Sequence, residues 1–192
     1  MPVPATAKQP MTAAEFLLID NHGLELIDGR PQEKNTGMFS STFAIWIVDL
    51  LIRRFDWHKY GYFTDSEGGY QCWPEDPICV RKPDIAFIRR EKLPGGVVPE
   101  GWCPVPPDFA IEILSKTDTL QLIEEKVANY LEVGVPLIWV VDPKKQEVYV
   151  YRGSLLPARL AGHDDLWDDA VLPGFRCRAQ ELFPQGETTG LT

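Results

Sequence analysis

Apolar and polar residues follow strand-like and helix-like patterns in turn along this chain. The clearest strand is residues 109–114, whose nearly continuous apolar character is typical of a sheet covered on both faces. The stretch AVLPGFRCRAQELF adds a short strand and a closing segment near the C-terminus. Similar apolar runs between turn residues predict further strands at residues 60–63, 69–73, 78–90, 136–142 and 147–152, and the strand at 78–90 is broken at Pro83.

Three segments have the pattern of helices. Thr12 and Glu15 form a capping-box pattern that opens a short helix. Residues 40–55 are apolar on most of the helical circumference, so we expect a helix that is covered on more than one side. Asp118 begins a third helix, whose apolar residues repeat at the helical period until Gly134.

Between the first two helices, the sequence LELIDGRP predicts a hairpin. Its turn is Asp28-Gly29, and a second short strand follows at residues 31–34. The order of elements is therefore helix, hairpin, helix, several strands, helix and two strands, which indicates a mixed-sheet α/β domain. The 192 residues predict one domain at residues 10–184, between flexible ends at residues 1–9 and 185–192.

Composition limits the kinds of partner. The net charge of −9 lacks the broad basic signature that supplies most nonspecific affinity for nucleic acids, so any contact with DNA must be local. The four cysteines and three histidines have no metal-ligand spacing, which argues against a zinc site. The N-terminus has no long apolar segment for a signal peptide or a membrane span, and we expect a cytoplasmic protein with reduced thiols.

Two acids interrupt otherwise apolar strands. Asp84 lies in RKPDIAFIRR, and Glu112 lies in FAIEILSK, where no neighbour in the strand is polar. A buried, unpaired carboxylate costs several kcal/mol, so each acid needs a cation, a hydrogen-bond donor or a proton. One shared Mg²⁺ would satisfy both, because this ion binds one or two carboxylates and fills its shell with water and phosphate. Each acid also has a structural alternative to metal binding. Asp84 could be a turn residue at the start of a strand, and Glu112 could be part of a buried salt bridge.

Several landmarks in the chain resemble the Uma2 family, also called DUF820. They are PDIAFI, FAIEILSK with a Lys and a Tyr on the next helix, GVPLIWVVDP, ELIDGRP and LPGF, and together they cover roughly residues 11–183. The family is similar to the PD-(D/E)XK nucleases, so the resemblance implies a restriction-endonuclease-like mixed β-sheet flanked by helices. It also implies that Asp84 and Glu112 bind Mg²⁺ or Mn²⁺, and that the chemistry is phosphodiester hydrolysis.

The lysine of the PD-(D/E)XK pattern is missing, because Leu114 stands two residues after Glu112. We expect Lys126 to supply the cation, since roughly 10 Å of strand and roughly 12 Å of returning helix bring it level with Glu112. Tyr130 lies one helical turn further on the same side and is a candidate support. A solvated helix-face lysine beside two glutamates is the alternative for Lys126.

Three more residues are candidates for support. Lys116 has the strand parity of Glu112, but four residues of strand separate them by roughly 13 Å. Glu25 and Glu33 lie in the predicted hairpin, and nucleases that this chain resembles often add an acid from an early element. Solvated hairpin glutamates are the alternative for both.

The densest basic cluster flanks Asp84 and suits a phosphate backbone, although a solvated strand edge explains it equally well. It consists of Arg81, Lys82, Arg89, Arg90 and Lys92.

The favoured interpretation is a metal-dependent endonuclease that hydrolyses DNA phosphodiester bonds, with Asp84, Glu112 and Lys126 as catalytic residues. The alternative is a catalytically inactive nuclease-fold module that binds nucleic acid or protein, and it agrees with Leu114 and with the acidic net charge. Hydrolysis of other phosphate esters also stays open, because two acids define a metal and not a substrate. A homodimer would suit the fold that the resemblance implies.

Overall fold

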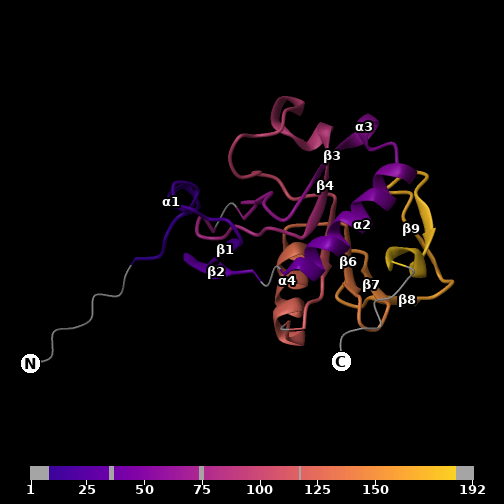
Figure 1. Cartoon of the computed structure of the whole chain (residues 1–192). Coiled ribbons are helices and arrows are strands. Elements are labelled where there is room, and N and C mark those ends of the chain that lie inside the picture. Colours follow the sequence, from indigo (N-terminus) through magenta and orange to yellow (C-terminus); the bar gives the residue numbers. More distant parts are fainter. Residues whose placement is uncertain (1–8, 35–36, 74–75, 117, 185–192) are drawn as a thin grey trace, which may run out of the picture.

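The computed structural model describes residues 9–34, 37–73, 76–116 and 118–184 of the chain (Figure 1). The flexible ends that the sequence predicts, residues 1–9 and 185–192, lie outside this part except for Gln9. No helix within it is long and apolar enough to cross a membrane. All four cysteines fall within it, and each is a free thiol.

A six-stranded mixed sheet forms the centre of the molecule, in the order β3-β4-β5-β6-β7-β8. Strands β5 and β6 are parallel, and the other neighbouring pairs are antiparallel. A parallel pair needs a crossover connection, which helix α4 (Leu120–Glu132) provides. The strands are β3 (Gly61–Thr64), β4 (Ile85–Arg89), β5 (Phe109–Ile113), β6 (Leu137–Asp142), β7 (Glu147–Tyr151) and β8 (Ala158–Ala161).

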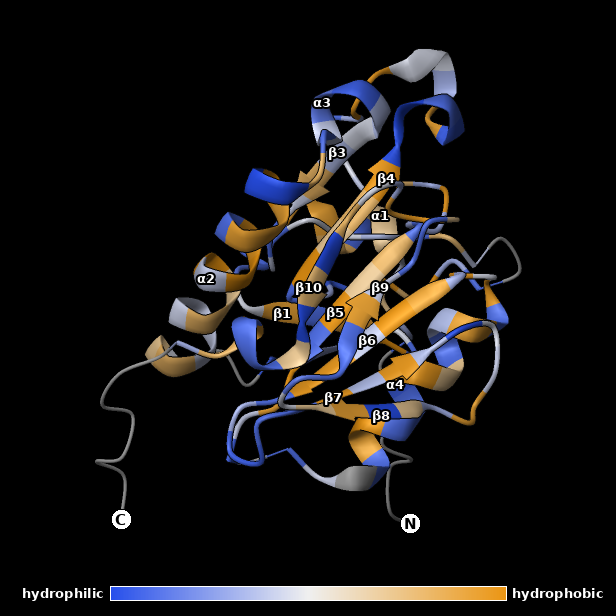
Figure 2. Ribbon diagram, turned by 90° about the vertical axis from the view of Figure 1, so that its right-hand side faces the viewer, coloured by the Kyte–Doolittle hydropathy of each residue, from blue (hydrophilic) through white to orange (hydrophobic). Residues whose placement is uncertain are grey.

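Both faces of this sheet are covered. One face packs against helix α2 (Met38–Arg54) and the C-terminal segment, and the other packs against α4 beside β5 and β6. The central strands are accordingly hydrophobic along most of their length (Figure 2). Because side chains alternate along a strand, Ile111 and Ile113 of β5 face α2, whereas Ala110 and Glu112 face α4.

A small N-terminal unit packs against the segment that precedes β4. It contains helix α1 (Ala13–Leu17) and the hairpin of β1 (Leu24–Ile27) and β2 (Arg30–Glu33). Asp28 and Gly29 both have positive φ, 49° and 68°, as a two-residue hairpin turn requires. The backbone of Leu26 exchanges two hydrogen bonds with that of Val80, at 3.0 and 2.8 Å. The hairpin is therefore fixed to the segment that leads into Asp84.

Short elements complete the fold. They are helix α3 (Trp57–Tyr60), the 3₁₀ helices η1 (Arg90–Lys92), η2 (Pro94–Gly96) and η3 (Ala179–Leu182), and the paired strands β9 (Asp165–Trp167) and β10 (Arg176–Arg178). β8, β9 and α3 have too little periodicity to be predicted from the sequence.

The capping box of Thr12 and Glu15 and the Asp28-Gly29 hairpin are confirmed. One strand prediction is wrong in part, because residues 69–73 make only isolated bridges, through Tyr70. The predicted break at Pro83 is confirmed: Val80 and Arg81 form isolated bridges before it, and β4 begins at Ile85 after it, since proline has no N–H to donate to a ladder.

Two helix predictions are also corrected. Helix α4 is capped by Thr119 and not by Asp118, whose Oδ2 instead accepts the backbone N–H of Ser115 at 2.6 Å. Helix α2 buries one side only, because it lies over one outer face of the sheet and its opposite side is open in the described part of the chain. Ile45 on that side is 70% exposed.

Truncation of Val127 tests the packing of α4 against the sheet. Val127 is 1% exposed and packs in the cluster that contains Ala110 and Ile138 of the sheet. We expect Val127→Ala to lower the free energy of unfolding by about 2 kcal/mol, through lost burial and the cavity left behind. Urea denaturation measures this free energy. Glu124→Ala, on the exposed side of α4, is the control, and its free energy of unfolding should stay within about 0.5 kcal/mol of that of the parent protein. Equal losses in the two variants would contradict this packing.

Candidate active site

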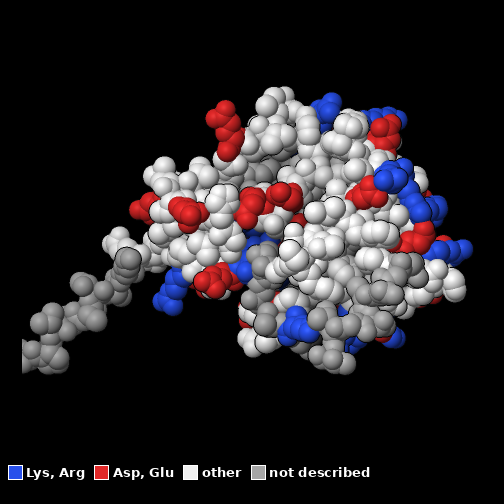
Figure 3. Space-filling model, in the orientation of Figure 1, with Lys and Arg blue, Asp and Glu red and all other residues white. Residues whose placement is uncertain are grey.

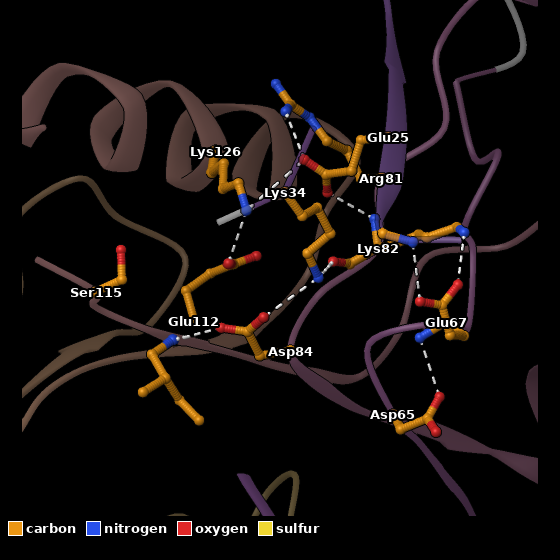
Figure 4. A network of polar contacts seen from close by, with 12 residues as sticks. Glu25, Lys34, Asp65, Glu67, Arg81, Lys82, Asp84, Glu112, Ser115 and Lys126 are labelled. Carbon is orange, nitrogen blue, oxygen red and sulfur yellow. Dashed lines mark hydrogen bonds and ion pairs between the residues drawn. The ribbon is translucent and has the colours of Figure 1, made fainter. Parts of the chain in front are cut away.

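Asp84 and Glu112 lie opposite each other across two neighbouring strands. The ladder of β4 and β5 pairs Ile85 with Ile111, and one further step of this register puts Asp84 opposite Glu112. Asp84 continues the ladder with its side chain, because its Oδ2 accepts the backbone N–H of Ile113 at 2.8 Å. Figure 4 shows the two carboxylates side by side. Like charges opposite each other destabilise a sheet, so this pair requires cations nearby.

Helix α4 supplies a cation and a hydrogen-bond donor to Glu112. Lys126 Nζ donates to Glu112 Oε2 at 2.9 Å, and the Tyr130 hydroxyl donates to Oε1 at 2.6 Å. The two residues are four positions apart and lie on the same side of the helix. The side chain of Lys126 is 18% exposed, so it is not a solvated surface lysine. The structure thus brings Lys126 and Tyr130 to Glu112, and their roles in chemistry stay predictions.

The hairpin adds a third carboxylate, that of Glu25. Glu25 Oε2 lies 3.7 Å from Lys126 Nζ and 3.4 Å from Arg81 Nη1, and its Oε1 accepts the backbone N–H of Lys82 at 2.7 Å. Arg81 also donates from Nε to Oδ1 of Asn129 on α4, at 3.0 Å. Glu25 therefore connects the hairpin, the segment before β4 and helix α4.

A second lysine, Lys34, lies beside Asp84. It directly follows β2, its Nζ is 3.2 Å from Asp84 Oδ1, and it also donates to the carbonyl of Lys82. Its side chain is only 3% exposed. Sequence patterns singled out Glu33 here, yet strand alternation is a signal that could have identified Lys34. It puts Lys34 on the same face of the hairpin as Glu25, and Glu33 on the other.

We call Glu25, Lys34, Arg81, Asp84, Glu112 and Lys126 the charged network. Its members come from the hairpin, the segment before β4, β5 and α4, which are far apart in the sequence (Figure 4).

The pKa values of the two glutamates move in opposite directions. Burial raises the pKa of Glu112, and Asp84 opposes its ionisation further, while Lys126 lowers it only in part. Burial also acts to raise the pKa of Glu25, but Lys126 and Arg81 outweigh it, and the pKa is lowered. Burial acts to lower the pKa of Lys126, yet the carboxylates of Glu112 and Glu25 raise it above its ordinary value. The network therefore favours a charged Lys126 and makes Glu112 the harder of the two glutamates to ionise.

The donor set of the two opposed acids fits a hard cation. Among the described residues, no group of three His, Cys, Asp or Glu side chains is arranged to hold a metal ion. Two carboxylate groups suit Mg²⁺ or Mn²⁺, whose remaining ligands are water and substrate phosphate. Zinc, which prefers several nitrogen or sulfur ligands, does not fit Asp84 and Glu112.

A groove of about 1560 Å³ lies next to the network. Lys34 lines it together with Leu114, two residues after Glu112. Its other walls include the segment after β5, the N-terminus of α2, the start of α4, the turn after β6 and strand β7. Among their side chains are Lys116, Lys144, Lys145, Tyr149 and Tyr151.

Two of the predicted supporting residues lie apart from the acids. Glu33 is exposed on β2, and Lys116 is exposed beyond the end of β5. Neither has a hydrogen bond or ion pair with Asp84 or Glu112 among the described residues. For Lys116 the reason is the distance along the strand, and for Glu33 it is strand alternation.

The basic cluster before and after Asp84 does not form one surface. Arg81 and Lys82 are buried, and Lys82 Nζ lies 3.0 Å from Glu67 Oε2, so their charges are already paired within the protein. The other three members follow at the far end of β4, where Lys92 lies 3.4 Å from Asp108. The face drawn in Figure 3 shows charged side chains of both signs spread among uncharged ones. Burial of Arg81 and Lys82 therefore agrees neither with a phosphate-binding surface nor with a solvated strand edge, the two alternatives that the sequence left open.

Comparison with known proteins identified similarity to a protein family and to solved structures. The model of the Uma2 family, described as "Putative restriction endonuclease", matches residues 13–180. A crystal structure of "a putative nuclease belonging to DUF820" from Anabaena variabilis ATCC 29413 has a TM-score of 0.73 at 19% identity, covering 91% of this chain and 98% of that chain. At this identity the likeness shows the fold alone, and it confirms the fold class that the sequence predicts. No curated protein matches the chain.

Removal of Lys126 tests the electrostatics of the network. We expect Lys126→Met to lower the free energy of unfolding by about 3 kcal/mol near neutral pH, because it leaves two buried carboxylates without their shared cation. The deficit should shrink as pH falls, since the pKa of Glu112 is already raised in the folded protein and loss of Lys126 raises it further.

Urea denaturation at several pH values measures this effect. The double variant Lys126→Met with Glu112→Gln is the control, because it removes the charge that Lys126 balances, and it should recover part of the loss. A deficit that is independent of pH and unaffected by Glu112→Gln would contradict the assigned pairing.

Proposed function

The chain belongs to the Uma2 family, and from this premise we propose that it is a metal-dependent endonuclease that hydrolyses phosphodiester bonds of DNA. One observation carries the proposal: Asp84 and Glu112 lie opposite each other on neighbouring strands, and Lys126 donates a hydrogen bond to Glu112. Two adjacent acids on a covered sheet face cost stability, and functional sites are where such arrangements are retained.

Asp84 and Glu112 are the residues that would hold Mg²⁺ or Mn²⁺. When bound, the ion would activate a water molecule and stabilise negative charge on the phosphate. The backbone N–H of Ile113 orients the Asp84 carboxylate, and Tyr130 orients that of Glu112. Oriented carboxylates need no rearrangement when the substrate arrives.

Lys126 has two tasks in this proposal. Its charge opposes the effects of burial and of Asp84 on Glu112, and so favours the carboxylate form that a metal ligand requires. As the cation that replaces the lysine missing at Leu114, it also stabilises negative charge on the scissile phosphate.

The groove supports a local path for the nucleic-acid backbone. Lys116 and Lys144 are exposed there, and Tyr149 and Tyr151 are half-buried in the same walls. Lysines attract phosphates and aromatic rings stack on unpaired bases, so this lining suits nucleic acid although the whole chain is acidic.

Cleavage assays test the catalytic assignment. We expect Glu112→Gln and Asp84→Asn to lower Mg²⁺- or Mn²⁺-dependent cleavage of plasmid DNA at least about 100-fold, which corresponds to about 2.7 kcal/mol of transition-state stabilisation. Glu33→Gln, an acid-to-amide change on the exposed face of the hairpin, is the matched control and should retain full activity.

Equal activity in all preparations would indicate a contaminating nuclease. Calorimetric titration with Mn²⁺ separates the proposal from a non-catalytic module, because binding should be lost in Asp84→Ala. Identical titration curves for Asp84→Ala and the parent protein, both with and without a phosphodiester, would favour the non-catalytic alternative.

Neutralisation of the groove lysines tests the path of the nucleic acid. We expect the double variant Lys116→Ala, Lys144→Ala to weaken DNA binding and to reduce the dependence of log K on log salt by about one to two units of slope, because each phosphate contact contributes about one. Fluorescence anisotropy with a labelled duplex measures this. Lys59→Ala on α3 is the control and should keep the parent slope, whereas an unchanged slope in the double variant would place the DNA elsewhere.

A further inference from the structure

The charged network is balanced without a metal ion. Its three carboxylates belong to Glu25, Asp84 and Glu112, and its three cations to Lys34, Arg81 and Lys126. With every group ionised, the formal charge is zero. A divalent ion held by Asp84 and Glu112 would therefore add two uncompensated positive charges to a largely buried site, where charge interactions are stronger than in water.

The two lysines differ in how firmly the network holds them. Lys126 lies within 3.7 Å of two carboxylates, Glu112 and Glu25, and it is not part of the groove wall. Within the described part of the chain, Lys34 has one carboxylate at ion-pair distance, that of Asp84, and it lines the groove. Lys34 is therefore the cation that can leave its carboxylate at the smaller electrostatic cost and remain near an incoming phosphate.

We propose that Lys34 occupies the cation position on Asp84 in the metal-free protein, and moves from Asp84 to the substrate phosphate when the metal and a phosphodiester bind together. This inference rests on the proposed function, and it adds a residue that the PD-(D/E)XK pattern does not contain. The phosphodiester brings one negative charge, which offsets one of the two charges of the ion and gives Lys34 an anionic partner in place of Asp84. Metal and phosphodiester consequently bind with positive coupling, and each strengthens the binding of the other by the same factor.

A structural lysine would behave differently. Lys34 also donates to the carbonyl of Lys82, so it contributes to the attachment of the hairpin. If this were its whole role, its replacement would lower stability, and a phosphodiester would tighten metal binding to the same extent with and without Lys34. The effect of a phosphodiester on metal affinity, compared between the parent protein and neutral variants of Lys34, is therefore the decisive measurement.

The experiment measures the Kd for Mn²⁺ from the electron paramagnetic resonance signal of the free ion. It compares the parent protein with Lys34→Met, and with Lys34→Gln, which is also neutral but retains a donor for the Lys82 carbonyl. Lys34→Arg keeps the positive charge, and Lys59→Met removes one positive charge from an exposed position on α3. Each titration is repeated with dimethyl phosphate, which carries the single charge of a phosphodiester, against sodium chloride at equal ionic strength.

We expect the two neutral variants to bind Mn²⁺ at least about tenfold more tightly than the parent protein when dimethyl phosphate is absent, because a competing cation has been removed. Dimethyl phosphate should tighten binding by the parent protein, and by Lys34→Met to a smaller extent. Lys34→Arg and Lys59→Met should resemble the parent protein. Binding by the neutral variants but not by the parent protein would also support the exclusion of metal by Lys34.

The variant Asp84→Asn distinguishes failure of the role of Lys34 from failure of the proposed function. Mn²⁺ binding that depends on Asp84 but is equal or weaker in both neutral variants would overturn the role of Lys34 and leave the proposed function standing. A complete lack of Asp84-dependent binding in every variant, with or without dimethyl phosphate, would overturn the proposed function and this inference together. Urea denaturation of each variant confirms that the comparison is made on folded protein.

Discussion

Repulsion between the carboxylates of Asp84 and Glu112 is the constraint on which the surrounding structure depends. Residues opposite each other in a ladder have Cβ atoms about 4.5–5.5 Å apart, and this pair lies on a face of the sheet that α4 covers. Water cannot screen the two charges there as it does at a surface. Lys126 and Tyr130 reach Glu112 from α4, and Lys34 reaches Asp84 from the hairpin. The position of each of these elements on the sheet is thus tied to one pair of charges.

The hairpin shows how much structure this arrangement requires. Its attachment uses the backbone pairing of Leu26 with Val80 and the contacts of Glu25 with Arg81 and with the N–H of Lys82. Lys82 itself is fully buried and donates to the carbonyl and side-chain oxygens of Asn21, each at 2.9 Å. Basic residues next to the PD sequence therefore hold the hairpin in place, and Arg81 adds a charge to the network. Rigid support of this kind keeps the side chains of a site in a fixed geometry.

The lengths of strand and helix predicted Lys126 beside Glu112, and the helical repeat predicted Tyr130 on the same side of the helix as Lys126. The position of Asp84 opposite Glu112 depends on the register between β4 and β5, which alternation within each strand does not determine. Lys34 was missed, because its partner is 50 residues away in the sequence and the docking of a hairpin on β4 leaves no periodic signal. The same limit explains the incorrect treatment of Arg81 and Lys82, whose burial follows from tertiary contacts. Residues 69–73 have the composition of a strand, but among the described residues they form only isolated bridges, through Tyr70, and no continuous ladder.

Leu114 gives a physical reason for two lysines in place of one. It lies on the face of Glu112, is half-buried and packs with the apolar residues of α4, such as Ile123 and Val127. A lysine at this position would put its charge among those side chains, at a cost that only a well-placed anion could offset. A cation that arrives from α4 reaches Glu112 without this cost, but it is then held by two carboxylates and is poorly placed to move. A second lysine with a single carboxylate partner supplies the mobile charge that the first cannot, and Lys34 at the edge of the groove is placed for that task.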